Sequence, residues 1–446
     1  MDVCFRMGVY IHTIDRLLTI VKQMNTMRNI LFSGVVLGLC AILFCLIMFV
    51  SCSGNGVSQP KRLQFTPAEQ QLVQDCNDFS FNLLAQTASD EQQENIILSP
   101  LSASMLLGML MNGADGETLR QIQQVVGFDD NTPLSDINAY YRQLIDALPA
   151  LDTETRLSLA NGIWVKETFP VKTDFVNAVK QNFYAEAKNV PTFTDNKVQD
   201  EINRFSAQHT NNLIKKVIDP GMVSEETVMA LVNALYFKAK WKDSFKKSDT
   251  RPQTFTTAAG KQLEVQMMHR TDELRYNEAD DYQFVELPYK GGKYCADILL
   301  PAKGIDARQW ISDIDAEQWQ QIIANTFYAE VELALPKFTL RYKRNLTSDL
   351  QALGMTDAFG INANFANLSD VPTSVSLIHQ HTFMQVDEEG TEAAAVTIGT
   401  MDKAAAPDPA FHRTFIADRP FIFIIRERDY GTILFTAIIG HPAWEK

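Results

Sequence analysis

Residues 388–409 read EEGTEAAAVTIGTMDKAAAPDP, and this stretch decides how the rest of the chain is interpreted. In its first half, small side chains occupy alternate positions: Thr391, Ala393, Ala395, Thr397 and Gly399. Because successive side chains of a strand point to opposite faces, these five share one face that could fit beneath a sheet. The second half holds turn formers without core-forming periodicity, which predicts an exposed loop. An ordinary strand followed by a surface loop explains the pattern alone equally well.

Helix signals lead the globular part of the chain. Thr66-Pro67-Ala68-Glu69 is a capping box with proline at the first helical position, and Ser99-Pro100 opens a second helix. Val331, Leu333 and Leu335 then recur at alternate positions, as the buried face of a strand does. Helices first and strands later predict an α+β fold.

Two apolar runs near the C-terminus predict a hairpin. Residues 421–425 are apolar throughout, which indicates a buried central strand, and residues 433–439 supply a second apolar strand. The polar residues 426–431 between them predict the turn.

The chain has 446 residues, with 40 Lys+Arg, 54 Asp+Glu, a formal charge of −14 and 46% hydrophobic residues. This composition is typical of a large globular domain and argues against a nucleic-acid partner, which requires clustered basic residues. The six cysteines are too few for a disulfide scaffold. Only Cys76 and Cys295 lie past Cys52, and we expect both to be isolated buried thiols.

The N-terminal residues 1–51 are interpreted as a leader. Residues 30–50 carry no charge and follow Lys22 and Arg28, which is typical of an export signal or a membrane anchor. Met24 or Met27 would begin a better signal than Met1, so we expect the start to be over-extended.

The residues around Cys52 indicate how the exported chain is held. Phe49-Val50-Ser51-Cys52 resembles the cleavage box of bacterial lipoproteins, whose cysteine becomes the lipidated N-terminus, although Phe49 stands where Leu is usual. The alternative is an uncleaved anchor. The chain is therefore expected at the membrane, facing the periplasm or cell surface, or secreted to the extracellular space, with residues 52–64 as a flexible tether and 65–446 as a single, monomeric domain.

Enzyme signatures are absent from the exported part: no GxGxxG, GxxxxGK[ST], GxSxG, HExxH or CxxC occurs there. His379 and His381 would share one face of a strand, but further metal ligands are not near in sequence, so we interpret both as structural. The sequence thus predicts a protein that is not an enzyme and has no cofactor or metal.

A resemblance to a known family extends over residues 65–442. EEGTEAAAVT at 388–397 matches, position for position, the hinge of the reactive loop of serpins, which inhibit proteases as suicide substrates. Further matches are NIILSPLSASMLLGMLMNGADGETLRQI from Asn95, LVNALYFKAKWKDSF from Leu231, LPYKGGKYCADILLP from Leu287, LPKFTLRYKRNLTSDLQALGMTDAF from Leu335 and RPFIFIIRERDYGTILF from Arg419. With Cys52, the chain resembles lipoprotein-type bacterial serpins.

The resemblance implies the serpin fold, with three β-sheets, about eight or nine helices and an exposed reactive-centre loop over residues 388–412. Serine, or also cysteine, endopeptidases would cleave this loop near Ala404–Ala405, with Lys403 and Met401 as alternatives. Residues 390–403 would then insert into the main sheet and trap the acyl-enzyme as a covalent complex. The implied hinge comprises Glu388, Glu389, Gly390, Thr391, Glu392, Ala393, Ala394, Ala395, Val396 and Thr397.

The resemblance also implies where the sheet opens. Ser99, Ser102 and Asn233 match a polar cluster beneath the parting strands, Trp241 matches an aromatic residue near the point where the loop enters, and the family's usual histidine is replaced by Gln380. A non-inhibitory serpin with a binding or chaperone-like role is the alternative. It would predict bulky or charged hinge residues.

Overall fold

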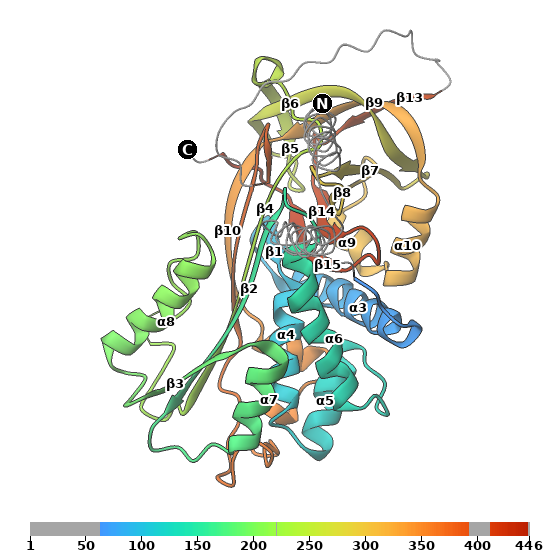
Figure 1. Cartoon of the computed structure of the whole chain (residues 1–446). Helices are drawn as coiled ribbons and strands as arrows, with labels where there is room; N and C mark the ends of the chain where they lie inside the picture. Colours follow the sequence, from blue (N-terminus) through green and yellow to red (C-terminus); the bar gives the residue numbers. More distant parts are fainter. Residues whose placement is uncertain (1–62, 220, 392–410, 445–446) are drawn as a thin grey trace, which may run out of the picture. The chain divides into compact units, whose positions relative to one another are not determined.

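The C-terminal hairpin lies inside the larger of two sheets, next to an edge strand (Figure 1). The computed structural model describes residues 63–219, 221–391 and 411–444. Strand β14 (Phe421–Glu427) lies between β15 (Ile433–Ile439) and β8 (Tyr294–Pro301), and every residue of the three strands is buried. The hairpin and the buried central strand are therefore confirmed.

The turn of this hairpin is shorter than predicted. Arg426 and Glu427 belong to β14 and are buried, so the predicted turn 426–431 is wrong at its start. Arg426 remains in the strand because Asp297 and Glu286 accept hydrogen bonds from its guanidinium, each at 2.6 Å. A buried charge is tolerated where it is paired and hydrogen-bonded.

The larger sheet has two portions. Along its path the strands are β1 (Asn95–Leu98), β15, β14, β8, β7 (Tyr282–Pro288), β6 (Gln262–Glu278), β9 (Phe327–Pro336) and β13 (His412–Ile416), while β5 (Arg251–Thr256) pairs with β6 beside this path. Only residues 275–278 of β6 pair with residues 283–286 of β7, so this short ladder joins the two portions. With the second sheet, the portions correspond to the expected three sheets.

The second sheet has six strands in the described chain. Their order is β10 (Phe338–Asn345), β11 (His379–Val386), β12 (Gly390–Thr391), β4 (Met229–Lys240), β2 (Arg156–Lys166) and β3 (Glu186–Val190). Strand β12 contributes only two residues to this order.

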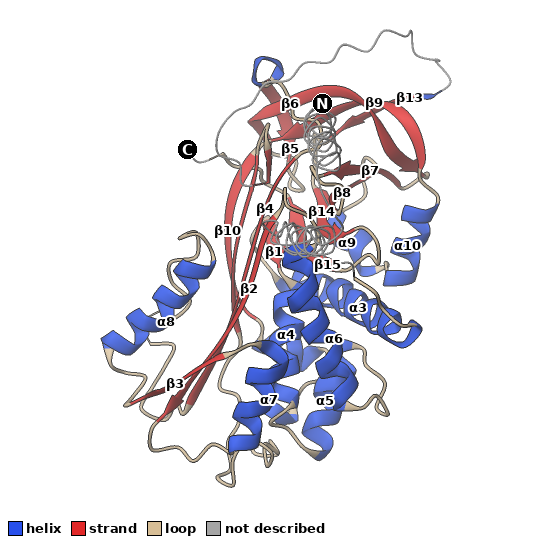
Figure 2. Ribbon diagram, in the orientation of Figure 1, coloured by secondary structure: helices blue, strands red, loops and turns tan. Residues whose placement is uncertain are grey.

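Nine α-helices lie in the described residues, as expected (Figure 2). They are α3 (Pro67–Asp90), α4 (Pro100–Met111), α5 (Gly116–Val126), α6 (Leu134–Ala147), α7 (Thr173–Phe183), α8 (Asn196–His209), α9 (Ala307–Ser312), α10 (Ala316–Ala324) and α11 (Thr347–Ala352). Short 3₁₀ turns lie at Leu148–Ala150, Lys247–Asp249 and Asp357–Phe359. Both predicted helix starts are confirmed: Thr66 and Glu69 form the capping box, and Ser99 caps α4.

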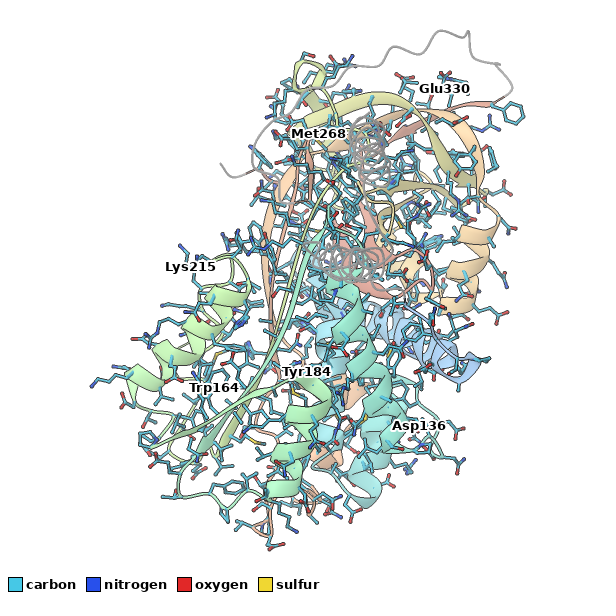
Figure 3. The ribbon with its side chains drawn as sticks, in the orientation of Figure 1. Asp136, Trp164, Tyr184, Lys215, Met268 and Glu330 are labelled. Carbon is cyan, nitrogen blue, oxygen red and sulfur yellow. The ribbon has the colours of Figure 1, made fainter. Side chains whose placement is uncertain are left out.

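A small separate core joins α8 to the six-stranded sheet. Trp164 of β2 is fully buried beside α8 (Figure 3), where its ring packs edge-on against Phe205 of that helix at 5.1 Å. The main core holds Cys76, and Cys295 is also buried; both are free thiols, as predicted. Among the described helices, none has the length and apolar character needed to cross a membrane.

Candidate functional site: a slot between β4 and β11

Two long strands of the six-stranded sheet are joined only near one end. Gly390 of β12 pairs with Lys240 of β4, while Thr391 pairs with Ala239 on one side and with Val386 of β11 on the other. Beyond Thr391 the described residues provide no strand between β4 and β11. We call this unfilled interval, between residues 229–235 of β4 and 379–383 of β11, the slot.

The slot contains a cavity of about 510 Å³. Residues of β4 and β11 form its sides, the start of α4 lies at its floor, and the connection that follows α8 lies over its outer side. The facing backbone edges of both strands therefore border space rather than a neighbouring strand. Unpaired edges of this kind are ready to pair with an added strand.

A polar cluster forms the floor of the slot. The backbone N–H of Ser99 donates to Gln380 Oε1 at 2.9 Å, and Gln380 Nε2 donates to the Ser99 carbonyl at 2.8 Å. The Ser99 hydroxyl donates to the Leu434 carbonyl and accepts from the N–H of Ser102. Gln380 thus connects α4 to β11 through two hydrogen bonds at the position where the family usually has histidine.

Asn233 lies on the opposite side of the slot. Its Nδ2 donates to Asn161 Oδ1 at 2.7 Å, and its own Oδ1 is buried without a hydrogen-bond partner. Ser99, Ser102, Gln380 and Asn233 all line the same cavity, so the structure brings together four of the five sheet-opening residues. An unsatisfied buried acceptor is costly and favours a state that supplies a donor.

Trp241, the fifth residue, lies at the closed end of the slot. Its ring stacks on Tyr289 with centroids 4.7 Å apart, and its indole N–H donates to the Asp387 carbonyl at 2.9 Å. Its backbone N–H donates to the Glu389 carbonyl at 2.8 Å. Trp241 therefore holds the turn that leads into β12, which agrees with a position near the start of the loop.

The first hinge residues are held by ion pairs. Glu388 is buried, and its carboxylate accepts from Lys337 Nζ at 3.0 Å and from the Thr250 hydroxyl at 2.9 Å. Burial alone would raise its pKa, but the hydrogen bonds from Lys337, Thr250 and the backbone hold that pKa below the usual range. Glu389 pairs with the exposed Lys247 at 2.9 Å. We call the contact of Glu388 with Lys337 and Thr250 the hinge anchor.

Thr391 is the last hinge residue that the structure describes. Its side chain is buried and its hydroxyl lies 2.6 Å from the Tyr289 hydroxyl, so it faces the core beneath the sheet. Hinge residues 392–397 and the bonds near Met401, Lys403, Ala404 and Ala405 lie outside the described residues, as does Cys52. The chain is described again at Phe411, and β13 then pairs in parallel with β9.

The outer side of the slot carries the two histidines. His379 and His381 share one face of β11, as predicted, with ring centroids 5.8 Å apart. Burial, together with like-charge repulsion from Lys343 and His379, lowers the pKa of His381 to about 4. Lys343 also pairs with Asp219 at 2.8 Å, which holds the connection after α8 against β10.

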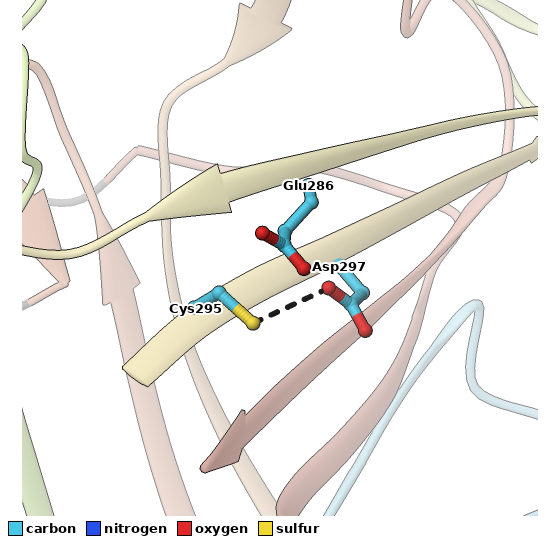
Figure 4. A group of neighbouring side chains, drawn as sticks. All are labelled: Glu286, Cys295 and Asp297. Carbon is cyan, nitrogen blue, oxygen red and sulfur yellow. Dashed lines mark hydrogen bonds between the residues drawn. The ribbon is translucent and has the colours of Figure 1, made fainter. Parts of the chain in front are cut away.

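A second cluster of ionisable groups was missed in the sequence, where the carboxylates showed no recognisable pairing. Glu286, Cys295 and Asp297 lie on β7 and β8 with ligand atoms within 4.8 Å of one another (Figure 4). Arg426 bonds to both carboxylates, and Arg275 and Arg428 also bond to Glu286. These guanidinium groups already satisfy the carboxylates, and burial raises the pKa of the Cys295 thiol well above its usual value. The cluster therefore stabilises the sheet and offers neither a thiolate nor a free metal-ligand set.

The hinge-anchor residues Lys337 and Thr250, and Tyr289 beside Thr391, were likewise not predicted. Lys337 and Tyr289 lie within the segments that carry the family resemblance, but nothing in the sequence pairs them with residues 388 and 391. Their roles follow only from the strand register.

The six-stranded sheet has an unfilled position between β4 and β11, and β12 occupies its closed end. The family model described as serpin (serine protease inhibitor) matches residues 74–442. The chain belongs to the serpin family. Its members are typically protease inhibitors without enzymatic activity, and they typically bind target proteases.

Relatives and solved structures agree with this assignment. Human neuroserpin is 30% identical over 374 residues, covering 82% of this chain and 90% of its own, and a serpin-like protein of Thermococcus kodakarensis is 32% identical over 380 residues, covering 84% and 86%. The crystal structure of the thermophilic serpin tengpin in its native state superimposes with a TM-score of 0.76 at 30% identity, covering 85% of this chain and 96% of that one. Native protease nexin-1 with heparin gives 0.72 at 28% identity, covering 85% and 100%.

Proposed function

We propose that this chain is a suicide-substrate inhibitor of serine, or also cysteine, endopeptidases. The protease cleaves the loop 388–412 near Ala404–Ala405, and residues 390–403 insert into the slot and trap the acyl-enzyme. The observation that carries the proposal is the position of β12: its two residues already occupy the closed end of the slot, in register with both neighbouring strands.

The register of β12 supports a specific fit for the rest of the hinge. Strand β12 is antiparallel to β4 and β11, so each residue further along it lies beside one residue earlier on both strands. In this register, Thr397 would lie between Gln380 and Asn233. The hydroxyl of Thr397 could then donate to Asn233 Oδ1, the buried acceptor that has no partner in the present state.

The small side chains of the hinge suit the same register. Positions 393, 395 and 397 would follow Thr391 onto the face that points to the core. An inserted strand would form about ten ladder hydrogen bonds at roughly 1 kcal/mol net each, which rivals the stability of a whole domain. That free energy is sufficient to displace a tethered protease and to misalign its oxyanion hole, where shifts of about 1 Å already slow catalysis strongly.

The chemistry at the bond belongs to the protease. Its serine attacks the carbonyl carbon before the cut, the amide bond breaks and the new amino terminus leaves with a proton, which gives an acyl-enzyme ester. Insertion must then precede attack by water on that ester. Lys403 suits a pocket with a carboxylate, whereas Ala404 and Met401 suit an apolar pocket.

Thr391→Arg tests the proposal. The arginine would need burial against Tyr289, so insertion should fail and the protein should be cleaved as a substrate. We expect wild-type protein, incubated with trypsin-like and elastase-like enzymes, to form complexes that resist SDS, and the variant to form none. Thr254→Arg, at an exposed position of β5, is the matched control. Mass spectrometry of the loop locates the cleaved bond. A Thr391→Arg protein that forms complexes with unchanged stoichiometry would contradict the mechanism.

We also propose that residues 1–51 direct export and that Cys52 carries a lipid that holds the inhibitor at the membrane, or that the leader remains as an anchor. The charge-free run at 30–50 and the Phe49–Cys52 box support this proposal. Labelling with a radioactive fatty acid, compared between wild type and Cys52→Ala, distinguishes the lipid from the uncleaved anchor.

A further inference from the structure

The C-terminal tail reaches the hinge anchor from the far end of the chain. After β15, Asn95 Oδ1 accepts from the N–H groups of Gly440 and His441, and the Ala443 carbonyl accepts from the N–H of Thr339 at 2.7 Å. The next residue, Trp444, places its ring over Lys337, with the ammonium nitrogen 4.1 Å from the ring centroid.

Lys337 therefore has two partners. Its ammonium lies against the Trp444 ring and donates to both carboxylate oxygens of Glu388 at 3.0 Å. The Lys337 side chain is 14% exposed and that of Glu388 is 6% exposed. A cation shielded from water in this way interacts strongly with a ring face, and the ring limits the rotamers of a long, flexible side chain.

The position of Glu388 fixes the start of β12. Its carbonyl accepts from the N–H of Phe245 at 2.8 Å, and a single residue separates it from Gly390, which pairs with Lys240. If the Lys337 side chain moved away, the buried Glu388 carboxylate would keep Thr250 as its remaining side-chain partner. The turn at residues 387–390 would then open more often.

We propose that Trp444 is a positioning residue for the hinge: its ring holds the Lys337 ammonium on Glu388, and this contact keeps β12 paired at the closed end of the slot. The link to inhibition rests on the proposed function, whereas the link from Trp444 to β12 does not. The tail thereby determines how fully β12 is paired with its neighbouring strands before any protease binds.

Hydrogen exchange of the full-length native protein tests the positioning role directly. Trp444→Ala should raise the exchange rate of a peptide covering residues 387–391 about fivefold. A peptide from β14 should exchange as in wild type. Trp444→Phe keeps an aromatic face and should restore most of the protection, whereas Trp444→Leu keeps apolar bulk only and should behave as Trp444→Ala does. Unchanged exchange in Trp444→Ala, or full protection in Trp444→Leu, overturns the proposal.

A second cycle identifies Lys337 as the intermediary. In a Lys337→Met background the cation is absent, so adding Trp444→Ala should leave the exchange of residues 387–391 unchanged. An additional fivefold effect in that background would show that Trp444 acts by another route, and would overturn the assignment. The stoichiometry of inhibition of Trp444→Ala is measured alongside. If wild-type protein inhibits none of the tested proteases while the exchange results hold, the proposed function fails and the positioning role stands.

Discussion

The two ends of the slot are built from the same two strands, yet they differ in what separates those strands. At the closed end, β12 supplies a strand between β4 and β11, and Trp241, Tyr289 and the hinge anchor hold it. At the open end the same strands border a cavity of about 510 Å³, and a polar cluster joins α4 to β11 beneath it.

The difference teaches that the sheet is complete only where the chain already supplies a third strand. Backbone groups along the open end lack a neighbouring strand within the described residues, which is a costly arrangement for a folded protein. If the loop inserts as proposed, the native state is held short of its best-paired arrangement. The contacts at the two ends should have opposite roles: those at the closed end begin pairing, and those at the open end keep the strands and α4 in place until pairing proceeds.

The largest expected effect comes from Gly390→Ala at the closed end. A Cβ at this position would lie 2.1 Å from the Ala239 carbonyl oxygen and 2.7 Å from the Lys240 Cα, so β12 would have to withdraw from β4. We expect a loss of about 3 kcal/mol in the free energy of unfolding, measured by urea denaturation. Gly360→Ala is the control, because the nearest atom to its Cβ is 4.0 Å away. Equal stability of the two variants would show that β12 does not pair closely in solution.

Gln380→Ala should have a smaller effect at the open end. It removes both hydrogen bonds to Ser99 and leaves the buried N–H of the helix cap unsatisfied, at a cost of about 2 kcal/mol. Gln262→Ala, at an exposed position at the start of β6, serves as the control in the same urea titration. If Gln380→Ala matched the control, the polar cluster would have no part in holding α4 against β11.

The smallest effect should appear as a pH dependence at the outer side of the slot. The pKa of His381 is about 4 in the folded protein, below its usual value of 6.5, so the unfolded chain binds more protons between these values. Stability is therefore full above pH 6.5 and is lost as the pH falls toward 4. We expect the melting temperature to fall by about 2 °C from pH 7 to pH 5 on this account, and His381→Gln to reduce that fall. An identical pH profile in His381→Gln would exclude this residue as the cause.

Local patterns predicted the elements better than they predicted the site. The capping box at Thr66, the cap at Ser99 and the apolar runs of β14 and β15 are signals within a few residues, and the structure confirms each of them. In the hinge anchor, Lys337 and Glu388 are 51 residues apart in sequence. Trp444, which contacts Lys337, lies more than fifty residues beyond Glu388. Such pairs leave no periodicity in the sequence.

Charged residues were the other source of error. Arg426 and Glu427 have turn-like polarity, but Arg426 is neutralised by carboxylates from β7 and β8, strands that precede it by more than 120 residues. The slot exists because β4 and β11 do not pair with each other in the described residues. A sequence pattern indicates which residues favour strands, and it carries no direct sign that two strands will remain apart.

The order of strands in the larger sheet has a consequence for synthesis. Strands β1 and β8 lie on either side of the C-terminal hairpin and are made long before it, so the two positions between them stay empty until the hairpin has been synthesised. Until then, the edges of β1 and β8 that pair with the hairpin in the folded protein have no partner strand. This order delays completion of the core until the C-terminal hairpin has been made.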